Sequence, residues 1–216
     1  MIEGFLMWML YYSPFFLALP ITIALVRFRF LKQALWYIVA FLGLSVLAQI
    51  LAYFLTKALG NNLILIHFYT VFELNIIALF YHALFGRFYP RWLVPSLMVF
   101  FTVFAVVSSI FFQKLTEFNT YARGLECVLV IVFSMMYFYK MLIELNTKRP
   151  EKCPIFWINT GFLFYFAGSL VLFILSNAIL KENKAFNYMS WGLHACVFAL
   201  LHIFIGIGLW YSPRLK

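Results

Sequence analysis

Seven long apolar runs, separated by short polar segments, constrain the fold of this chain more than any other feature. The runs recur along all 216 residues, and each is long enough to cross a hydrocarbon core about 30 Å thick as a helix. Hydrophobic residues make up 66% of the chain, whereas soluble domains have roughly 45–50%. A transmembrane β-barrel would need segments of about ten residues with alternating polarity, and the sequence has none. We therefore predict an all-α membrane protein, a bundle of seven transmembrane helices.

The polar breaks between the runs set the expected limits of the helices. The predicted spans are 5–26, 34–56, 63–85, 93–112, 125–145, 155–180 and 190–211, within a single domain of residues 1–216. The connections are too short for a separate soluble domain, so specific chemistry is expected inside the bundle or at its ends. The first run lacks the basic start and the cleavage site of a secretory signal, and we expect it to remain as an uncleaved anchor.

The distribution of Lys and Arg predicts the orientation. The connections after spans 1, 3 and 5, with the C-terminal segment, hold eleven basic residues: Arg27, Arg29, Lys32, Arg87, Arg91, Lys140, Lys148, Arg149, Lys152, Arg214 and Lys216. The opposite side holds five, namely Lys57, Lys114, Arg123, Lys181 and Lys184. Basic connections stay in the cytoplasm, which predicts an outside N-terminus and a cytoplasmic C-terminus in a bacterial inner membrane. The net charge of +9 is scattered; it suits contact with the lipid bilayer and argues against a nucleic-acid partner.

A carboxylate near the middle of the membrane is the most unusual local feature. Glu73 lies in the third run, "HFYTVFELNIIALFYHALF" (67–85), in a chain without any Asp. A charge at this depth costs at least about 2.5–3.5 kcal/mol, so Glu73 must be protonated, paired or beside a wet cavity. Asn75 lies about 160° around the helix from Glu73. If Glu73 faces the interior of the bundle, Asn75 must therefore contact another helix.

Polar side chains of spans 3, 5 and 7 fall at common depths. At 1.5 Å per residue, His67, Glu126 and His194 lie about 10–12 Å outside the midplane, while His202 lies near the level of Glu73. Two imidazoles and a carboxylate could bind a divalent metal such as zinc, whose water could attack a lipid ester or amide. Ordinary bonds between helices and a polar ligand pocket are the competing interpretations. The predicted pocket residues are His67, Thr70, Glu73, Glu126, His194 and His202.

Several motifs of other membrane proteins are missing. Span 190–211 has no lysine for a Schiff base, so no retinal is expected. It also has no H-x-x-x-H, which seven-helix lipid hydrolases of the adiponectin-receptor and alkaline-ceramidase type would require. The three cysteines form no C-x-x-C pair. No cofactor is predicted apart from the metal of the zinc hypothesis.

Two stretches resemble a group of small bacterial seven-span proteins without an assigned activity. They are "NNLILIHFYTVFELNIIALFYHALF" (61–85) and "FWINTGFLFYFAGSLVLFILSN" (156–177). The first contains the aromatic-Glu segment of that group, and the second its Phe-Trp-Ile-Asn-x-Gly start of span 6. The group is similar to membrane modules used in bacterial signalling, often with a histidine kinase encoded separately or fused. The resemblance implies a sensor with such a partner.

The favoured hypothesis is a sensor or receptor-like module, not an enzyme, with a small apolar or amphiphilic ligand in an outward-facing pocket. Few residues follow Tyr211, so output is expected to need another protein at the basic cytoplasmic loops. One alternative is an intramembrane metal-dependent lipid hydrolase with Glu73 as acid or base. The other is a small proton-coupled transporter in which Glu73 carries the proton.

Overall fold

The computed structural model describes residues 2–144 and 149–212, and these residues form helices without any strand. The first half contains α1 (Ile2–Tyr12), η1 (Ser13–Leu17), α2 (Ala18–Val26), η2 (Phe28–Phe30), α3 (Gln33–Leu59), α4 (Leu63–Phe85), α5 (Leu93–Val107) and η3 (Ser108–Phe112). The second half contains α6 (Thr120–Glu144), η4 (Pro150–Lys152), α7 (Pro154–Ile174), α8 (Ser176–Ile179) and α9 (Lys184–Trp210). Seven of these segments, with α1 to α2 and α5 to η3 each taken as one, are long and apolar enough to cross a membrane. The predicted multi-pass helical fold is confirmed.

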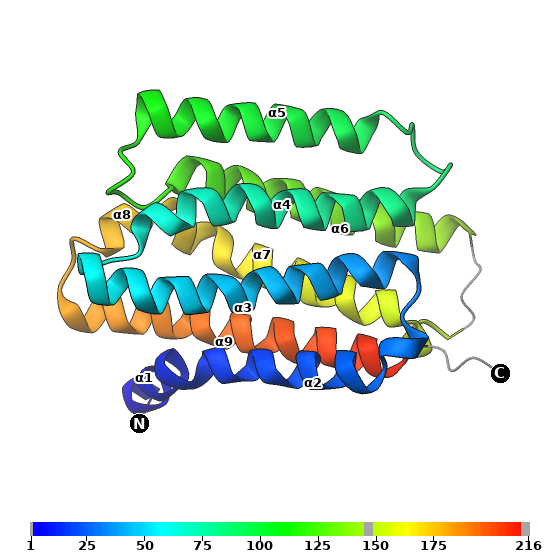
Figure 1. Ribbon diagram of the computed structural model, residues 1–216, viewed down its shortest axis with the longest axis horizontal. Helices are drawn as coiled ribbons and strands as arrows, with labels where there is room; N and C mark the ends of the chain where they lie inside the picture. The colour runs from blue at the N-terminus through cyan, green and yellow to red at the C-terminus, as the bar shows by residue number, and fades with distance from the viewer. Residues whose placement is uncertain (1, 145–148, 213–216) are drawn as a thin grey trace.

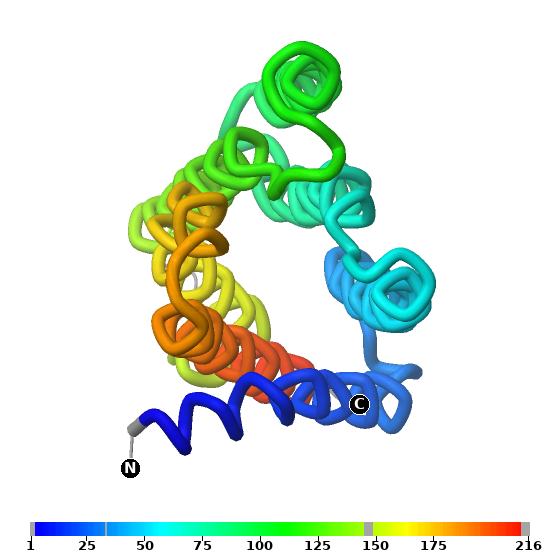
Figure 2. Tube along the Cα trace, turned by 90° about the vertical axis from the view of Figure 1, so that its left-hand side faces the viewer, coloured from blue at the N-terminus to red at the C-terminus, as the bar shows by residue number. Residues whose placement is uncertain are grey.

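Six of the spans form a ring, and the remaining one lies outside it (Figure 2). Around the ring, α9 packs on α1 and α2, α7 on α9, α6 on α7, α4 on α6, and α3 on α4. The ring closes through a small contact between α2 and α3. Helix α5 packs on the outer side of α4 and α6. There the Asn75 amide donates to Thr102 Oγ1 at 3.2 Å, which confirms the predicted contact of Asn75 with another helix.

The two ends of the bundle are defined by their connections (Figure 1). The Asn62 end carries the start of α1 and the connections at 60–62, 113–119 and 175–183, whereas the Gly86 end carries 27–32, 86–92 and the last turn of α9. Of the predicted basic residues, Lys148, Arg214 and Lys216 lie outside the described residues, as does Leu145, the predicted end of span 5.

The first span is interrupted where a proline enters it. Pro14 has no backbone N–H to donate, and Ser13–Leu17 form the tighter turn η1 between α1 and α2. Helix α1 lies along α9, and it does not pack extensively on α3. In Figure 2, the start of α1 lies beside α9 and apart from the end of α3. The wall between α1 and α3 is therefore the least closed part of the ring.

Helices α7 and α9 approach each other closely because glycine occupies their contact. A Cβ atom added at Gly161 would lie 2.8 Å from Phe204 Cβ, and one at Gly208 would lie 2.7 Å from the Pro154 carbonyl oxygen. Small residues let helices of membrane proteins pack this tightly by dispersion forces. The α7–α9 pair thus forms a rigid side of the ring.

Three predicted limits differ from the structure by five residues or more, and one of these differences matters for function. Helix α7 ends at Ile174 instead of 180, and α9 begins at Lys184 instead of 190. Lys184 is exposed. Helix α6 begins at Thr120 instead of 125, so Arg123 lies inside the helix and not in a connection. Gln113 Oε1 accepts the Tyr121 N–H at 3.2 Å, which satisfies one of the free donors at the start of α6.

Candidate functional site

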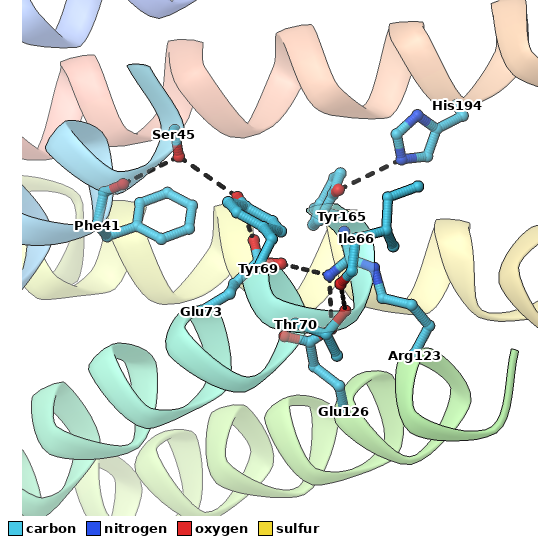
Figure 3. A network of polar contacts seen from close by, with 10 residues as sticks. All are labelled: Phe41, Ser45, Ile66, Tyr69, Thr70, Glu73, Arg123, Glu126, Tyr165 and His194. Carbon is cyan, nitrogen blue, oxygen red and sulfur yellow. Dashed lines mark hydrogen bonds and ion pairs between the residues drawn. The ribbon is translucent and has the colours of Figure 1, made fainter. Parts of the chain in front are cut away.

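A buried ion cluster of one arginine and two glutamates joins α4 to α6 (Figure 3). Arg123 Nη1 donates to Glu73 Oε2, and the same nitrogen donates to Glu126 Oε2 at 2.5 Å. Glu73 is 1% exposed, Glu126 0% and Arg123 7%. With both carboxylates ionised, the cluster has one positive and two negative charges. Glu73 is thus a paired carboxylate, one of the three states expected for it from the sequence.

Aromatic rings and hydroxyl groups surround the guanidinium. The Tyr69 hydroxyl donates to Glu73 Oε1 at 2.9 Å, and Ser45 Oγ lies 3.5 Å from the same hydroxyl. The Arg123 guanidinium lies 4.7 Å from the centre of the Phe173 ring and 5.4 Å from that of Tyr69. Contact with ring faces stabilises a cation away from water. The cluster is therefore anchored by α3, α4, α6 and α7.

Two polar atoms of the cluster have no partner among the described residues. They are Arg123 Nε and Glu126 Oε1. Ser169 Oγ on α7 is also buried and unpaired. Helices α6 and α7 run antiparallel, and contacts between Arg123 and Phe173 and between Ser134 and Asn159 set their register. That register places Ser169 near the level of Glu126, so unpaired groups gather at the same depth.

A cavity of about 530 Å³ opens beside the cluster, toward the Asn62 end. This volume lies in the range of roughly 300–1,000 Å³ found for small-molecule sites. Its walls are mostly apolar and come from α1, η1, α3, α4, α6, α7 and α9. Its polar lining comprises Ser45, Gln49, Tyr69, Arg123, Tyr165 and His194, with Ser13 and Asn62 toward the rim. The cavity is thus a large apolar space with polar groups gathered near the ion cluster.

Two of the cavity's polar groups form a pair across α7 and α9 (Figure 3). The Tyr165 hydroxyl lies 3.3 Å from His194 Nε2. The His194 ring also contacts the rings of Phe173 and Trp191, with centroids 5.1 and 5.8 Å away. Both a phenol and a neutral imidazole can donate and accept hydrogen bonds. His194 is therefore the one predicted pocket histidine that lines the cavity.

The 113–119 connection covers part of the cavity, and polar side chains hold it in place. The Asn177 amide accepts the Phe118 N–H at 2.9 Å and donates to the Phe118 carbonyl at 2.9 Å, while the Phe118 ring lines the cavity. His67 Nε2 donates to the Glu117 carbonyl at 3.1 Å, which leaves Nδ1 to accept from the Ser109 hydroxyl at 2.9 Å. His67 thus positions the cover of the cavity and does not line it.

Two further predicted pocket residues do not line the cavity. Thr70 is fully buried and donates to the Ile66 carbonyl of its own helix at 2.7 Å. His202 Nδ1 donates to the Phe198 carbonyl at 2.8 Å, and its ring centroid lies 4.3 Å from that of Phe198. Glu73 and Glu126 are also not among the lining residues. Of the six predicted residues, His194 alone lines the cavity. The two glutamates contact Arg123, which lines it.

The predicted metal set of His67, Glu126 and His194 is not assembled. Among residues 2–144 and 149–212, no three His, Cys, Asp or Glu side chains lie together as a metal site. His67 points to the 113–119 connection, Glu126 to Arg123, and His194 to Tyr165. The three share a depth but face different neighbours. These three side chains therefore do not form the predicted zinc site.

Sequence reasoning missed the residues that organise the site, namely Arg123, Tyr69 and Tyr165. Arg123 was assigned to an outer connection, because a charge normally marks the end of an apolar run. The spacing held a signal: Arg123 lies three residues before Glu126, and Tyr69 four before Glu73, which are neighbouring positions on a helix. Without Arg123, the outer set of basic residues falls from five to four.

No protein-family model, no curated protein and no solved structure matches this chain. The resemblance of its third and sixth spans to bacterial signalling proteins stays a prediction. Both stretches nevertheless carry polar network residues. Glu73 lies in the ion cluster, and Asn159 of "FWINTG" accepts from the Tyr81 hydroxyl at 2.7 Å and donates to the Ser134 carbonyl at 3.2 Å.

Proposed function

We propose that this protein is a sensor or receptor-like seven-helix module that binds a small apolar or amphiphilic ligand in the cavity beside Arg123. It would lie in a bacterial cytoplasmic membrane, with the Asn62 end outside and the Gly86 end in the cytoplasm. The excess of Lys and Arg at the Gly86 end supports this orientation. A cytoplasmic partner, such as a separately encoded histidine kinase, would contact the basic connections there.

The observation that carries the proposal is the cavity itself. It combines about 530 Å³ of mostly apolar space with a few polar groups, among them Arg123, Tyr165 and His194, the usual composition of a small-molecule site. Leu10 of α1 and Ala52 of α3 both line the cavity, and these two helices do not pack extensively on each other. A ligand dissolved in the bilayer would have its entrance between them.

Filling the cavity from α3 tests this function. Ala48 lines the cavity, so Ala48→Phe should occupy part of it. Leu47 is its neighbour on the same helix and is 52% exposed, so Leu47→Phe is the matched control. Native mass spectrometry of protein released from micelles should detect about one bound amphiphile per chain in the wild type and in Leu47→Phe, and none in Ala48→Phe. If all three forms carry the same adducts or none, ligand binding in the cavity is refuted.

The ion cluster supports a second candidate, the proton-coupled transporter. Glu73 and Glu126 share a single cation, and intramembrane acidic residues are a common feature of proton relays. In this case, Glu73→Gln should abolish pH-driven uptake of a solute into proteoliposomes, while Glu182→Gln, at an exposed position, should not. Unchanged uptake in Glu73→Gln would remove this candidate.

A further inference from the structure

The charge of the ion cluster bears on which head group the cavity accepts. We infer that it selects amphiphiles with an uncharged hydrogen-bonding head group, such as an alcohol or an ester, over fatty acids. This inference rests on the proposed ligand binding. An arginine beside an apolar cavity would ordinarily indicate a carboxylate ligand. In this protein, however, Arg123 already binds two carboxylates of the chain itself.

The charges of the cluster disfavour anionic and cationic head groups alike. Arg123 Nη1 already donates to Glu73 and Glu126, so with both carboxylates ionised its positive charge is more than balanced. A ligand carboxylate would be a third acid beside one cation, and like charges brought together in a desolvated site repel strongly. A cationic head group is disfavoured for a different reason. Arg123 lines the cavity and neither glutamate does, so an ammonium group in the cavity would meet the positive charge of the guanidinium.

An uncharged head group instead meets unused hydrogen-bonding capacity. Arg123 lines the cavity and is 7% exposed, although its Nε–H itself is buried and has no partner among the described residues. An ester or hydroxyl oxygen can accept a hydrogen bond from the exposed part of the guanidinium without adding a charge to the cluster. The Tyr165 hydroxyl and the His194 ring line the same space, and both can bond to a hydroxyl in either direction.

Two probes with the same bromoalkyl chain length, one with an uncharged and one with an anionic head group, test this selectivity. We suggest ω-bromo-undecanol and ω-bromo-undecanoic acid, with the acid ionised at pH 8, added to the full chain in nanodiscs. Bromine quenches nearby indole, and Trp191 lines the cavity. Quenching that persists in Trp191→Phe is background from the other tryptophans. We expect the alcohol to bind with a dissociation constant at least about tenfold below that of the acid.

A change of the cluster charge provides the decisive comparison. Glu126→Gln removes one carboxylate without removing the Arg123 side chain, so affinity for the acid should rise and the alcohol preference should fall by about tenfold. Glu73→Gln should have the same effect, which covers the case in which Glu126→Gln does not fold. Glu182→Gln changes an exposed carboxylate and should leave the preference unaltered.

The outcomes separate this inference from the function on which it rests. If the acid binds as well as the alcohol, and Ala48→Phe blocks both probes, the cavity binds ligands but the charge argument is overturned. If neither probe quenches Trp191 beyond the level seen in Ala48→Phe, both the selectivity and the proposed binding function fail. A preference for the alcohol that is unchanged in Glu126→Gln and Glu73→Gln would also overturn the role of the cluster.

Discussion

Removal of the Arg123 guanidinium should destabilise this fold more than any other single change to a polar side chain. Arg123→Met would leave Glu73 and Glu126, which are 1% and 0% exposed, without a cation. Removal of one partner of a buried ion pair costs about 3–5 kcal/mol. The contact of the guanidinium with the Phe173 ring at 4.7 Å adds about 1 kcal/mol. We therefore expect a loss of about 4–6 kcal/mol in the free energy of unfolding.

The measurement is an equilibrium SDS titration in mixed micelles, followed by the helical circular dichroism signal. Lys57→Met is the control, because Lys57 is an exposed cation at the Asn62 end. Surface substitutions of this kind change stability by about 0.5 kcal/mol or less. If the free energy of unfolding of Arg123→Met lies within about 1 kcal/mol of that of this control, the buried ion cluster does not stabilise the fold by the expected amount.

A triple variant distinguishes the charge effect from simple loss of packing. Glu73→Gln and Glu126→Gln, combined with Arg123→Met, leave no buried charge in the cluster. Replacement of a whole buried ion cluster by neutral residues of similar volume is often tolerated. The triple variant should therefore recover more than half of the stability lost in Arg123→Met. A triple variant no more stable than Arg123→Met would show that packing, and not uncompensated charge, causes the loss.

Two further substitutions test the packing of the bundle in the same titration. Gly161→Ala places a Cβ 2.8 Å from Phe204 Cβ and should lower the free energy of unfolding by about 1–3 kcal/mol through overpacking. Gly43→Ala is the control and should have little effect, because no atom lies within 4 Å of its added Cβ. Equal effects of the two substitutions would contradict the close approach of α7 and α9. Asn159→Leu removes the acceptor of the buried Tyr81 hydroxyl and should cost about 1–3 kcal/mol, and a variant as stable as wild type would contradict that role.

The positions of the spans could be predicted because the bilayer sets a single requirement, the length of an apolar helix. Residues 63–85 were predicted as the third span, and α4 is Leu63–Phe85. The face of α4 that carries Asn75 also followed from helical geometry alone. These properties depend on local sequence and on depth, and neither requires knowledge of the neighbouring helices.

The contents of the site could not be predicted, because depth does not determine which helices face one another. His67, Glu126 and His194 were correctly recognised as polar residues inside spans, but they face the 113–119 connection, Arg123 and Tyr165 respectively. Arg123 was misplaced since its charge is stabilised in the helix by Glu126 and by Glu73, the latter fifty residues away in the chain.

By itself, the sequence determined that this chain forms seven apolar helices and that Glu73, at its depth, would be protonated, paired or beside a wet cavity. The tertiary structure decided that the partner is Arg123, that Glu126 shares it, and that a cavity opens beside them. The physical reason is that depth in the membrane is a single coordinate, whereas contacts between helices depend on all three. Hydrophobicity reports the depth of each residue along the membrane normal, whereas ion pairs and cavities depend on which helix faces are packed together.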